Sequence, residues 1–156
     1  MKIELIAVGT RAPDWVAAGF AEYQKRMPKE CELTLSEVSV AKRKSNSSVA
    51  QLKELEGAQM LDRIRPRSHV VALDVKGKSW NTEQLADKLQ QWMSEVPSVS
   101  LLVGGPDGLS EGCLARSDET WSLSALTFPH FLVRVILAEQ LYRAVSIINN
   151  HPYHRV

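Results

Sequence analysis

Short apolar runs alternate with segments of helical periodicity along the whole chain, and this alternation restricts the possible folds more than any other feature. The apolar runs predict strands over residues 2–8, 31–38, 69–75, 98–103 and 121–126. The segments between them predict helices over residues 13–26, 49–63, 82–95, 110–117 and 132–148. Strands and helices that alternate in this way form α/β folds, in which helices flank a mostly parallel central sheet.

The length of 156 residues is that of one ordinary domain, and we expect a single domain over residues 1–156. Apolar residues make up 44% of the chain, but no apolar run approaches the 18 or so residues of a membrane span. The first apolar run is interrupted by Glu4 and is typical of a strand rather than a signal peptide. These features predict a soluble, cytoplasmic protein without a membrane partner.

Cysteine content and net charge exclude several other classes of protein. Cys31 and Cys113 lack the close spacing of a zinc knuckle or a redox pair, so we expect free, partly buried thiols. The 19 basic and 18 acidic residues give a formal charge of +1. Any contact with nucleic acid must therefore come from a local basic face.

The apolar run that ends at Val103 leads directly into a glycine-rich turn. Gly105-Pro-Asp-Gly108 fits a type I turn, and Gly104 before it allows a ligand to approach the backbone. The carboxyl end of a buried strand is where open α/β sheets bind ligands. Because the spacing matches neither G-x-G-x-x-G nor a P-loop, we expect a ligand held by backbone amides and carbonyls rather than a phosphate cradle.

A second apolar run, over residues 121–130, contains small side chains at Ser122, Ser124 and Ala125. Beside Gly104, these residues would leave room for a flat group of the size of adenine. Its apolar walls would be Leu73, Leu123 and Leu126. The alternative interpretation is ordinary core packing.

The last predicted helix, residues 132–148, has apolar residues on more than one side. A helix that is apolar on several sides is buried on several sides. This pattern predicts either a subunit interface or a central core helix.

The end of the chain, residues 149–155, contains two histidines, a tyrosine and an arginine. A metal site at His151 and His154 is disfavoured because no acidic or cysteine ligand stands nearby in the sequence. Proton transfer and contact with a base or phosphate suit these side chains better.

Basic residues recur near this tail and in the middle of the chain, where they form either a phosphate-binding face or an ordinary solvated surface. One of them, Arg143, also has the spacing of a helical ion pair with Glu139. The candidate basic residues are Arg134, Arg143, Arg155, residues 42–44, Arg63, Arg65 and Arg67.

Taken together, these segments resemble the large-subunit ribosomal RNA pseudouridine methyltransferases of the SPOUT superfamily. The resemblance runs from end to end and is carried by Val-Gly-Thr at 8–10, Pro-Asp-Trp at 13–15, Leu-Asp at 73–74, Gly-Lys at 77–78 and Asn-His-Pro-Tyr-His-Arg at 150–155. It implies a SPOUT-type α/β knot, in which the carboxyl-terminal part of the chain forms a trefoil knot. It also implies a homodimer that methylates N3 of a pseudouridine in 23S rRNA on the assembled ribosome, with S-adenosylmethionine as methyl donor and no metal.

The resemblance also implies where the donor binds. Its expected contacts in the knot are Leu73, Gly104, Leu123, Ser124, Ala125, Leu126, Thr127 and Phe128. For the tail, our hypothesis is that Tyr153 or His154 positions the target base or accepts its proton. Arg143 and Arg155 would hold phosphate or stabilise developing negative charge.

Two other functions are compatible with the same motifs. The first is a SPOUT enzyme that methylates a different nucleotide, for example at a ribose 2′-hydroxyl. The second is a ribosome-binding protein that has kept the fold and lost the reaction. An intact donor site argues against the second, and binding of S-adenosylmethionine would decide it.

Overall fold

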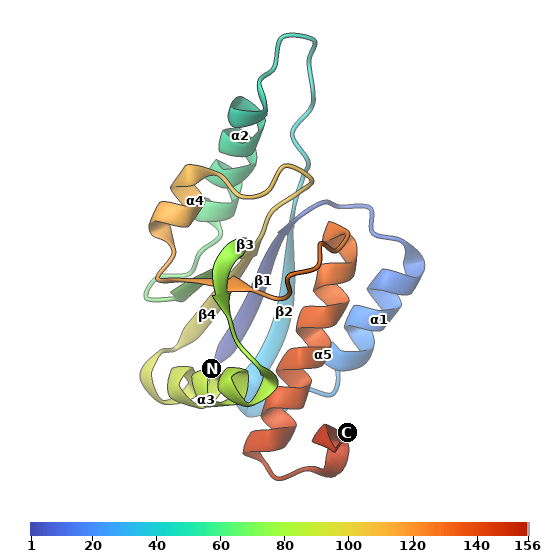
Figure 1. Cartoon of the computed structure of the whole chain (residues 1–156), viewed down its shortest axis with the longest axis vertical. Coiled ribbons are helices and arrows are strands. Elements are labelled where there is room, and N and C mark those ends of the chain that lie inside the picture. Colours follow the sequence, from blue (N-terminus) through green and yellow to red (C-terminus); the bar gives the residue numbers. More distant parts are fainter. Residues whose placement is uncertain (156) are drawn as a thin grey trace.

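The computed structural model describes residues 1–155, which form an α/β fold around a five-stranded sheet (Figure 1). The sheet order is β2-β1-β4-β3-β5, and every paired strand is parallel to its neighbour. The strands are β1 (Lys2–Val8), β2 (Glu32–Val38), β3 (His69–Ser79), β4 (Ser98–Val103) and β5 (Glu119–Ser122). The predicted fold class, a mostly parallel α/β sheet flanked by helices, is confirmed, whereas the trefoil knot stays a prediction.

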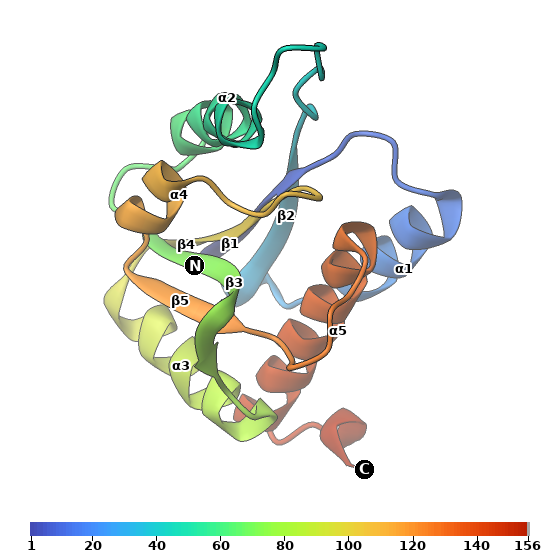
Figure 2. The same ribbon diagram turned by 45° about the horizontal axis from the view of Figure 1, so that its top comes forward.

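Helices cover both faces of this sheet (Figure 2). On one face α5 lies between α1 and α3, and on the other face α2 packs against α4. The helices are α1 (Asp14–Gln24), α2 (Val49–Asp62), α3 (Thr82–Glu95), α4 (Glu111–Arg116) and α5 (His130–Ile148). Short 3₁₀ turns form at Lys29–Cys31 and Pro152–His154. No helix within residues 1–155 has both the length and the apolar content needed to cross a bilayer.

The core is divided into two parts by the alternation of side chains along the strands. Leu101 of β4 belongs to the core under α1, α3 and α5, whereas Leu102 belongs to the core under α2 and α4. All six residues of β4 are buried, which explains why this strand has an uninterrupted apolar sequence.

Local sequence signals set the start of α3 as predicted. The side chain of Asn81 accepts a hydrogen bond from the Gln84 amide at 2.8 Å, and Gln84 Oε1 accepts one from the Asn81 amide at 2.9 Å. This capping box satisfies backbone donors that the helix itself leaves free. The predicted range 82–95 matches the helix residue for residue.

The predicted strand over residues 121–126 was wrong beyond Ser122, because β5 runs from Glu119 to Ser122. Beyond that point, Ser122 Oγ donates to the Ser124 carbonyl at 3.2 Å and Ser124 Oγ accepts from the Leu126 amide at 2.9 Å. Such bonds between serine side chains and nearby backbone compete with a strand ladder. The segment therefore leaves the sheet as a loop.

The other boundaries differ by smaller amounts. β3 runs on from the predicted 69–75 to Ser79, and its pairing with β5 changes register between Leu73 and Lys78. β2 begins one residue later than predicted, after a 3₁₀ turn. The predicted helices 13–26, 49–63, 110–117 and 132–148 are observed at 14–24, 49–62, 111–116 and 130–148.

The packing of α5 bears on the two interpretations of its apolar surface. No residue of α5 is classed as exposed, and its buried Leu137 and Leu141 share one core with Phe20 of α1 and Leu89 of α3. Contacts within one chain thus account for much of its apolar character, as the core-helix interpretation predicts. The subunit interface stays a prediction.

Candidate functional site

The glycine-rich turn after β4 forms as predicted. The Gly108 amide donates to the Gly105 carbonyl at 3.0 Å, and Gly108 has a φ of +84°, which glycine adopts without strain. A Cβ atom on Gly104 would lie 2.5 Å from the carbonyl carbon of Gly108. Gly104 therefore allows the turn to fold back onto the strand end, a requirement of the loop itself that the sequence argument did not foresee.

A cavity of about 260 Å³, the glycine-turn cavity, lies at the carboxyl ends of β4 and β5 and beside the middle of β3. Seven of the eight residues expected to contact the methyl donor line it: Leu73, Gly104, Leu123, Ser124, Leu126, Thr127 and Phe128. The eighth, Ala125, is exposed and is not among the lining residues. Residues from three separate segments thus gather around one cavity.

Two titratable residues that we did not predict as ligand contacts, Asp74 and His130, also line the glycine-turn cavity. Burial, with a smaller effect from the charge of Arg134, lowers the pKa of His130, so its imidazole is neutral at neutral pH. The site therefore combines a carboxylate with a neutral imidazole. Asp74 follows the apolar part of β3, so its position at the ligand-binding edge of a parallel sheet was a signal present in the sequence.

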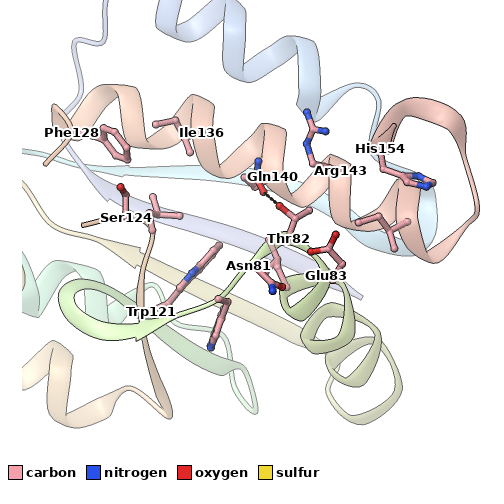
Figure 3. Close-up of a pocket in the computed structure, with 14 residues that line it drawn as sticks. Asn81, Thr82, Glu83, Trp121, Ser124, Phe128, Ile136, Gln140, Arg143 and His154 are labelled. Atoms are coloured by element: carbon pink, nitrogen blue, oxygen red, sulfur yellow. Dashed lines mark hydrogen bonds between the residues drawn. The ribbon is translucent and has the colours of Figure 1, made fainter. Parts of the chain in front are cut away.

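A second and larger cavity, of about 750 Å³, lies between the start of α3 and one side of α5; we call it the α3–α5 cavity (Figure 3). Its polar lining includes Asn81 and Thr82 from the start of α3 and Gln140 and Arg143 from α5. It shares four residues with the glycine-turn cavity, namely Trp121, Leu123, Ser124 and Phe128. The two cavities therefore adjoin along the loop that follows β5.

The carboxyl-terminal tail folds back against α5. The Tyr153 hydroxyl donates to Glu139 Oε1 at 3.1 Å, and its ring packs 4.6 Å from the ring of Tyr142. The Arg143 guanidinium donates to the same Glu139 oxygen at 2.9 and 2.6 Å. His154 lines the α3–α5 cavity, whereas Arg155 is exposed. The structure thus places Arg143, Tyr153 and His154 in one cluster and leaves Arg155 at its solvent side.

The environments of Tyr153 and His154 favour different roles. Burial, together with hydrogen bonds to Tyr23 and Glu139, raises the pKa of Tyr153 well above its ordinary value. This phenol stays protonated and acts as a hydrogen-bond donor, so it is a poor base. The Nδ1 atom of His154 is buried and has no hydrogen-bond partner within residues 1–155. Of the two candidates for accepting a proton, the histidine fits better.

The glycine-turn cavity and the tail lie near opposite ends of α5. His130, at the first turn of the helix, lines the glycine-turn cavity, while Arg143 lies thirteen residues further along. At 1.5 Å per residue this separation is about 20 Å. Of the tail residues 149–155, none lines the glycine-turn cavity in this conformation, and His154 lines only the adjoining α3–α5 cavity.

The predicted basic face needs one correction, at Arg134. Only 1% of its side chain is exposed, and it donates to Glu37 Oε2 at 2.8 Å and to the Gly9 carbonyl at 2.7 Å. An arginine buried in this way is structural, so Arg134 does not belong to the phosphate-binding face for which it was a candidate. Arg43 and Arg65 are also engaged, in ion pairs with Asp107 and Glu4.

Both cysteines are free, as their spacing predicted, but they are fully rather than partly buried. Burial raises the pKa of the Cys31 thiol to about 11, as expected for an unreactive core cysteine. Among residues 1–155, no three histidine, cysteine, aspartate or glutamate side chains are grouped as ligands for a metal ion.

Comparison with known proteins shows the family to which this chain belongs. Residues 1–154 match the family described as "Predicted SPOUT methyltransferase". The chain belongs to the SPOUT methyltransferase family. Three relatives named ribosomal RNA large subunit methyltransferase H match over 155 residues, or 99% of this chain. They are 51% identical in Methylococcus capsulatus, 55% in Thioalkalivibrio sulfidiphilus and 52% in a Marinomonas species, and at least 99% of each relative is covered.

Solved structures of more distant proteins share the fold of this SPOUT family member. A putative methyltransferase from Legionella pneumophila, solved with the cofactor SAM, superposes with a TM-score of 0.52 and is 10% identical. The alignment covers 93% of this chain and 66% of that structure. A probable methylase family protein from Haemophilus influenzae gives a TM-score of 0.54 at 14% identity, covering 97% of this chain and 69% of that protein.

Proposed function

We propose that this SPOUT methyltransferase methylates N3 of a pseudouridine in 23S rRNA on the assembled ribosome, with S-adenosylmethionine as methyl donor. The observation that carries the proposal is the match, at 51–55% identity over almost the entire chain, to relatives named ribosomal RNA large subunit methyltransferase H. The choice of N3 and of pseudouridine rests on the resemblance described for the sequence, above all on its tail motif.

The chemistry of the glycine-turn cavity fits this donor. Leu73 and Leu126 provide apolar walls for an adenine ring, and the turn at residues 104–108 provides backbone hydrogen-bonding groups. When bound, S-adenosylmethionine supplies a methyl group activated by a positively charged sulfonium. Asp74 favours a cationic ligand, and the lowered pKa of His130 removes a competing positive charge from the cavity.

The tail residues supply what remains of the reaction, namely a proton acceptor and contacts to the RNA. His154 takes the N3 proton of the base, because its Nδ1 atom has no hydrogen-bond partner within residues 1–155 and histidine is the side chain most often used for proton transfer. Tyr153, a protonated donor, positions the base. Arg143 and Arg155 hold phosphate or stabilise negative charge on the base as the proton leaves. The proposal assigns no role to a metal.

We also propose that the enzyme works as a homodimer in the cytoplasm, where it meets ribosomes. The position of the tail supports this, because a tail that does not line its own donor cavity can serve that of a second copy. Mixing a variant defective in donor binding with a His154→Ala variant should then restore part of the activity.

The test of the proposed function is methylation of ribosomes that lack the modification, followed by mass spectrometry of the 23S rRNA. We expect one new methyl group on the base of one pseudouridine, and a slower single-turnover rate when Tyr153, His154 or Arg155 is replaced. A methyl group on a ribose 2′-hydroxyl would support the alternative SPOUT activity. Failure to bind S-adenosylmethionine in calorimetry would support a non-catalytic ribosome-binding protein.

A further inference from the structure

Glu139 has a pattern of contacts that an ordinary helix ion pair does not have. Its side chain is only 18% exposed, and both carboxylate oxygens accept hydrogen bonds. Oε1 accepts from the Arg143 guanidinium and from the Tyr153 hydroxyl, while Oε2 accepts from Gln140 Nε2 at 2.8 Å. One carboxylate therefore holds the tail and two neighbouring residues of α5.

The contacts of Glu139 continue across the α3–α5 cavity. Gln140, held by Glu139 through its amide nitrogen, accepts a hydrogen bond on Oε1 from Thr82 Oγ1 at 3.0 Å (Figure 3). The polar lining of the cavity is thus joined from the start of α3 through α5 to the tail. Hydrogen bonds to an ionised carboxylate are roughly twice as strong as neutral ones, which makes Glu139 the strongest link in this chain of contacts.

A second glutamate, Glu22, shows how an ordinary helical ion pair differs from the contacts of Glu139. Glu22 of α1 pairs with Lys25 and Arg26, three and four residues further along the same helix, and 40% of its side chain is exposed. Such pairs contribute little to stability. Glu139 also has Arg143 four residues along, but it adds Tyr153, which lies beyond the end of the helix. A pair that serves only helix stability does not need that third donor.

We propose that Glu139 is a positioning residue for methyl transfer: it holds Tyr153 and Arg143 in the arrangement in which the tail meets the target nucleoside. Glu139 itself touches neither the base nor the donor. This inference rests on the proposed function for its effect on rate, but the ordering of the tail by Glu139 is a separate property that is measurable without substrate.

The experiment compares Glu139→Gln with a matched control, Glu119→Gln. Glu119 is a partly buried carboxylate as well, 23% exposed and bonded to Lys88 at 2.7 Å and His69 at 3.0 Å, but it lies in β5 and lines neither cavity. Three quantities are measured for each purified variant: the single-turnover methylation rate on ribosomes, the affinity for S-adenosylmethionine, and deuterium uptake by the tail, residues 149–155.

For Glu139→Gln we expect a methylation rate about tenfold lower or more, as for the loss of a hydrogen bond to a charged group. We also expect faster deuterium uptake in the tail and unchanged donor affinity. Glu119→Gln should change none of the three. Glu139→Asp, which keeps the charge, should recover part of the rate. Tyr153→Phe, which removes the hydroxyl from the same bond, should speed tail exchange, and combining it with Glu139→Gln should add little further.

Two outcomes decide against the inference. A wild-type rate together with unchanged tail exchange in Glu139→Gln overturns it. Equal rate losses in Glu139→Gln and Glu119→Gln would mean a general effect on stability and would overturn it as well. If the wild-type protein does not methylate ribosomes, the proposed function fails; faster tail exchange in Glu139→Gln and Tyr153→Phe would then still support the ordering of the tail by Glu139.

Discussion

At the scale of single residues, the glycine-turn cavity is formed both by side chains that line it and by backbone that must pack closely in the turn. Leu126 is 70% exposed, yet it lines the cavity as an apolar wall. Gly104 lines the same cavity, but its main constraint comes from the Gly108 backbone folded against it. The two residues therefore differ in what a substitution should do.

Replacing Leu126 with alanine should weaken binding of S-adenosylmethionine about tenfold. The substitution removes apolar contacts with the ligand, and their loss costs binding free energy of the order of 1.5 kcal/mol. Stability should be almost unchanged, since the side chain is mostly exposed. Leu55→Ala is the matched control: Leu55 is 60% exposed and does not line the cavity. Calorimetric titration measures both, and equal affinities for the two variants would remove Leu126 from the donor site.

Replacing Gly104 with alanine should distort the turn, because the new Cβ would lie 2.5 Å from the Gly108 carbonyl carbon. We expect a loss of roughly 1–3 kcal/mol in the free energy of unfolding and loss of donor binding. Gly112→Ala in α4, where the nearest atoms are 3.8 Å from the new Cβ, should instead stabilise by about 0.5 kcal/mol. Urea denaturation distinguishes the two, and a fully stable Gly104→Ala protein would contradict the backbone argument.

At the scale of the elements, α5 connects the sheet, the cavities and the tail. Its first turns are anchored by Arg134, which reaches the carbonyls of Val8 and Gly9 at the end of β1 and the carboxylate of Glu37 on β2. Further along, the helix carries Gln140 and Arg143 into the α3–α5 cavity. The contacts of Arg134 near the start of the helix therefore help to position Gln140 and Arg143 in the α3–α5 cavity.

Replacing Arg134 with leucine should lower the free energy of unfolding by about 3 kcal/mol, because it leaves the buried carbonyls and Glu37 without their donor. For a domain of this length, we expect the midpoint of thermal unfolding to fall by roughly 6–12 °C. Glu37→Gln, which keeps an oxygen that can accept a hydrogen bond from Arg134, should lower the free energy of unfolding much less. If the thermal midpoint of Arg134→Leu lies within about one or two degrees of the wild-type midpoint, the contacts of Arg134 are not needed for stability.

At the scale of the whole molecule, an ionic cluster joins elements at the edge of the sheet away from the glycine turn. Glu119 at the start of β5 bonds to His69 of β3 and Lys88 of α3, and Asp118 lies beside His69. Burial alone would raise the pKa of Glu119, but the hydrogen bonds from Lys88 and His69 outweigh it and lower the pKa. The cluster therefore stabilises the fold most where Glu119 is ionised.

A carboxyl group whose pKa is lower in the folded state than in the unfolded state stabilises the protein at pH values above its unfolded-state pKa. This stabilisation is lost as the pH falls through its folded-state pKa. Wild type should therefore be more stable than Glu119→Gln at neutral pH. The difference should shrink as the pH falls from about 6 to about 3. Thermal unfolding followed by circular dichroism across this range measures it. A difference that stays constant with pH would show that the ionised form is not favoured by folding.

The sequence alone determined the α/β class, the order of the elements and the glycine turn, because hydrophobic periodicity, the Asn81 cap and Gly105-Pro-Asp-Gly108 act over a few neighbouring residues. It also grouped seven residues that line one cavity, through resemblance and the rule for strand ends. Tertiary structure decided that Arg134 is buried and that Glu139 holds Tyr153. Both depend on partners brought together by packing, so local pattern does not determine them. The end of β5 at Ser122 depends instead on serine bonds to backbone two residues away, a local signal that the apolar pattern does not show.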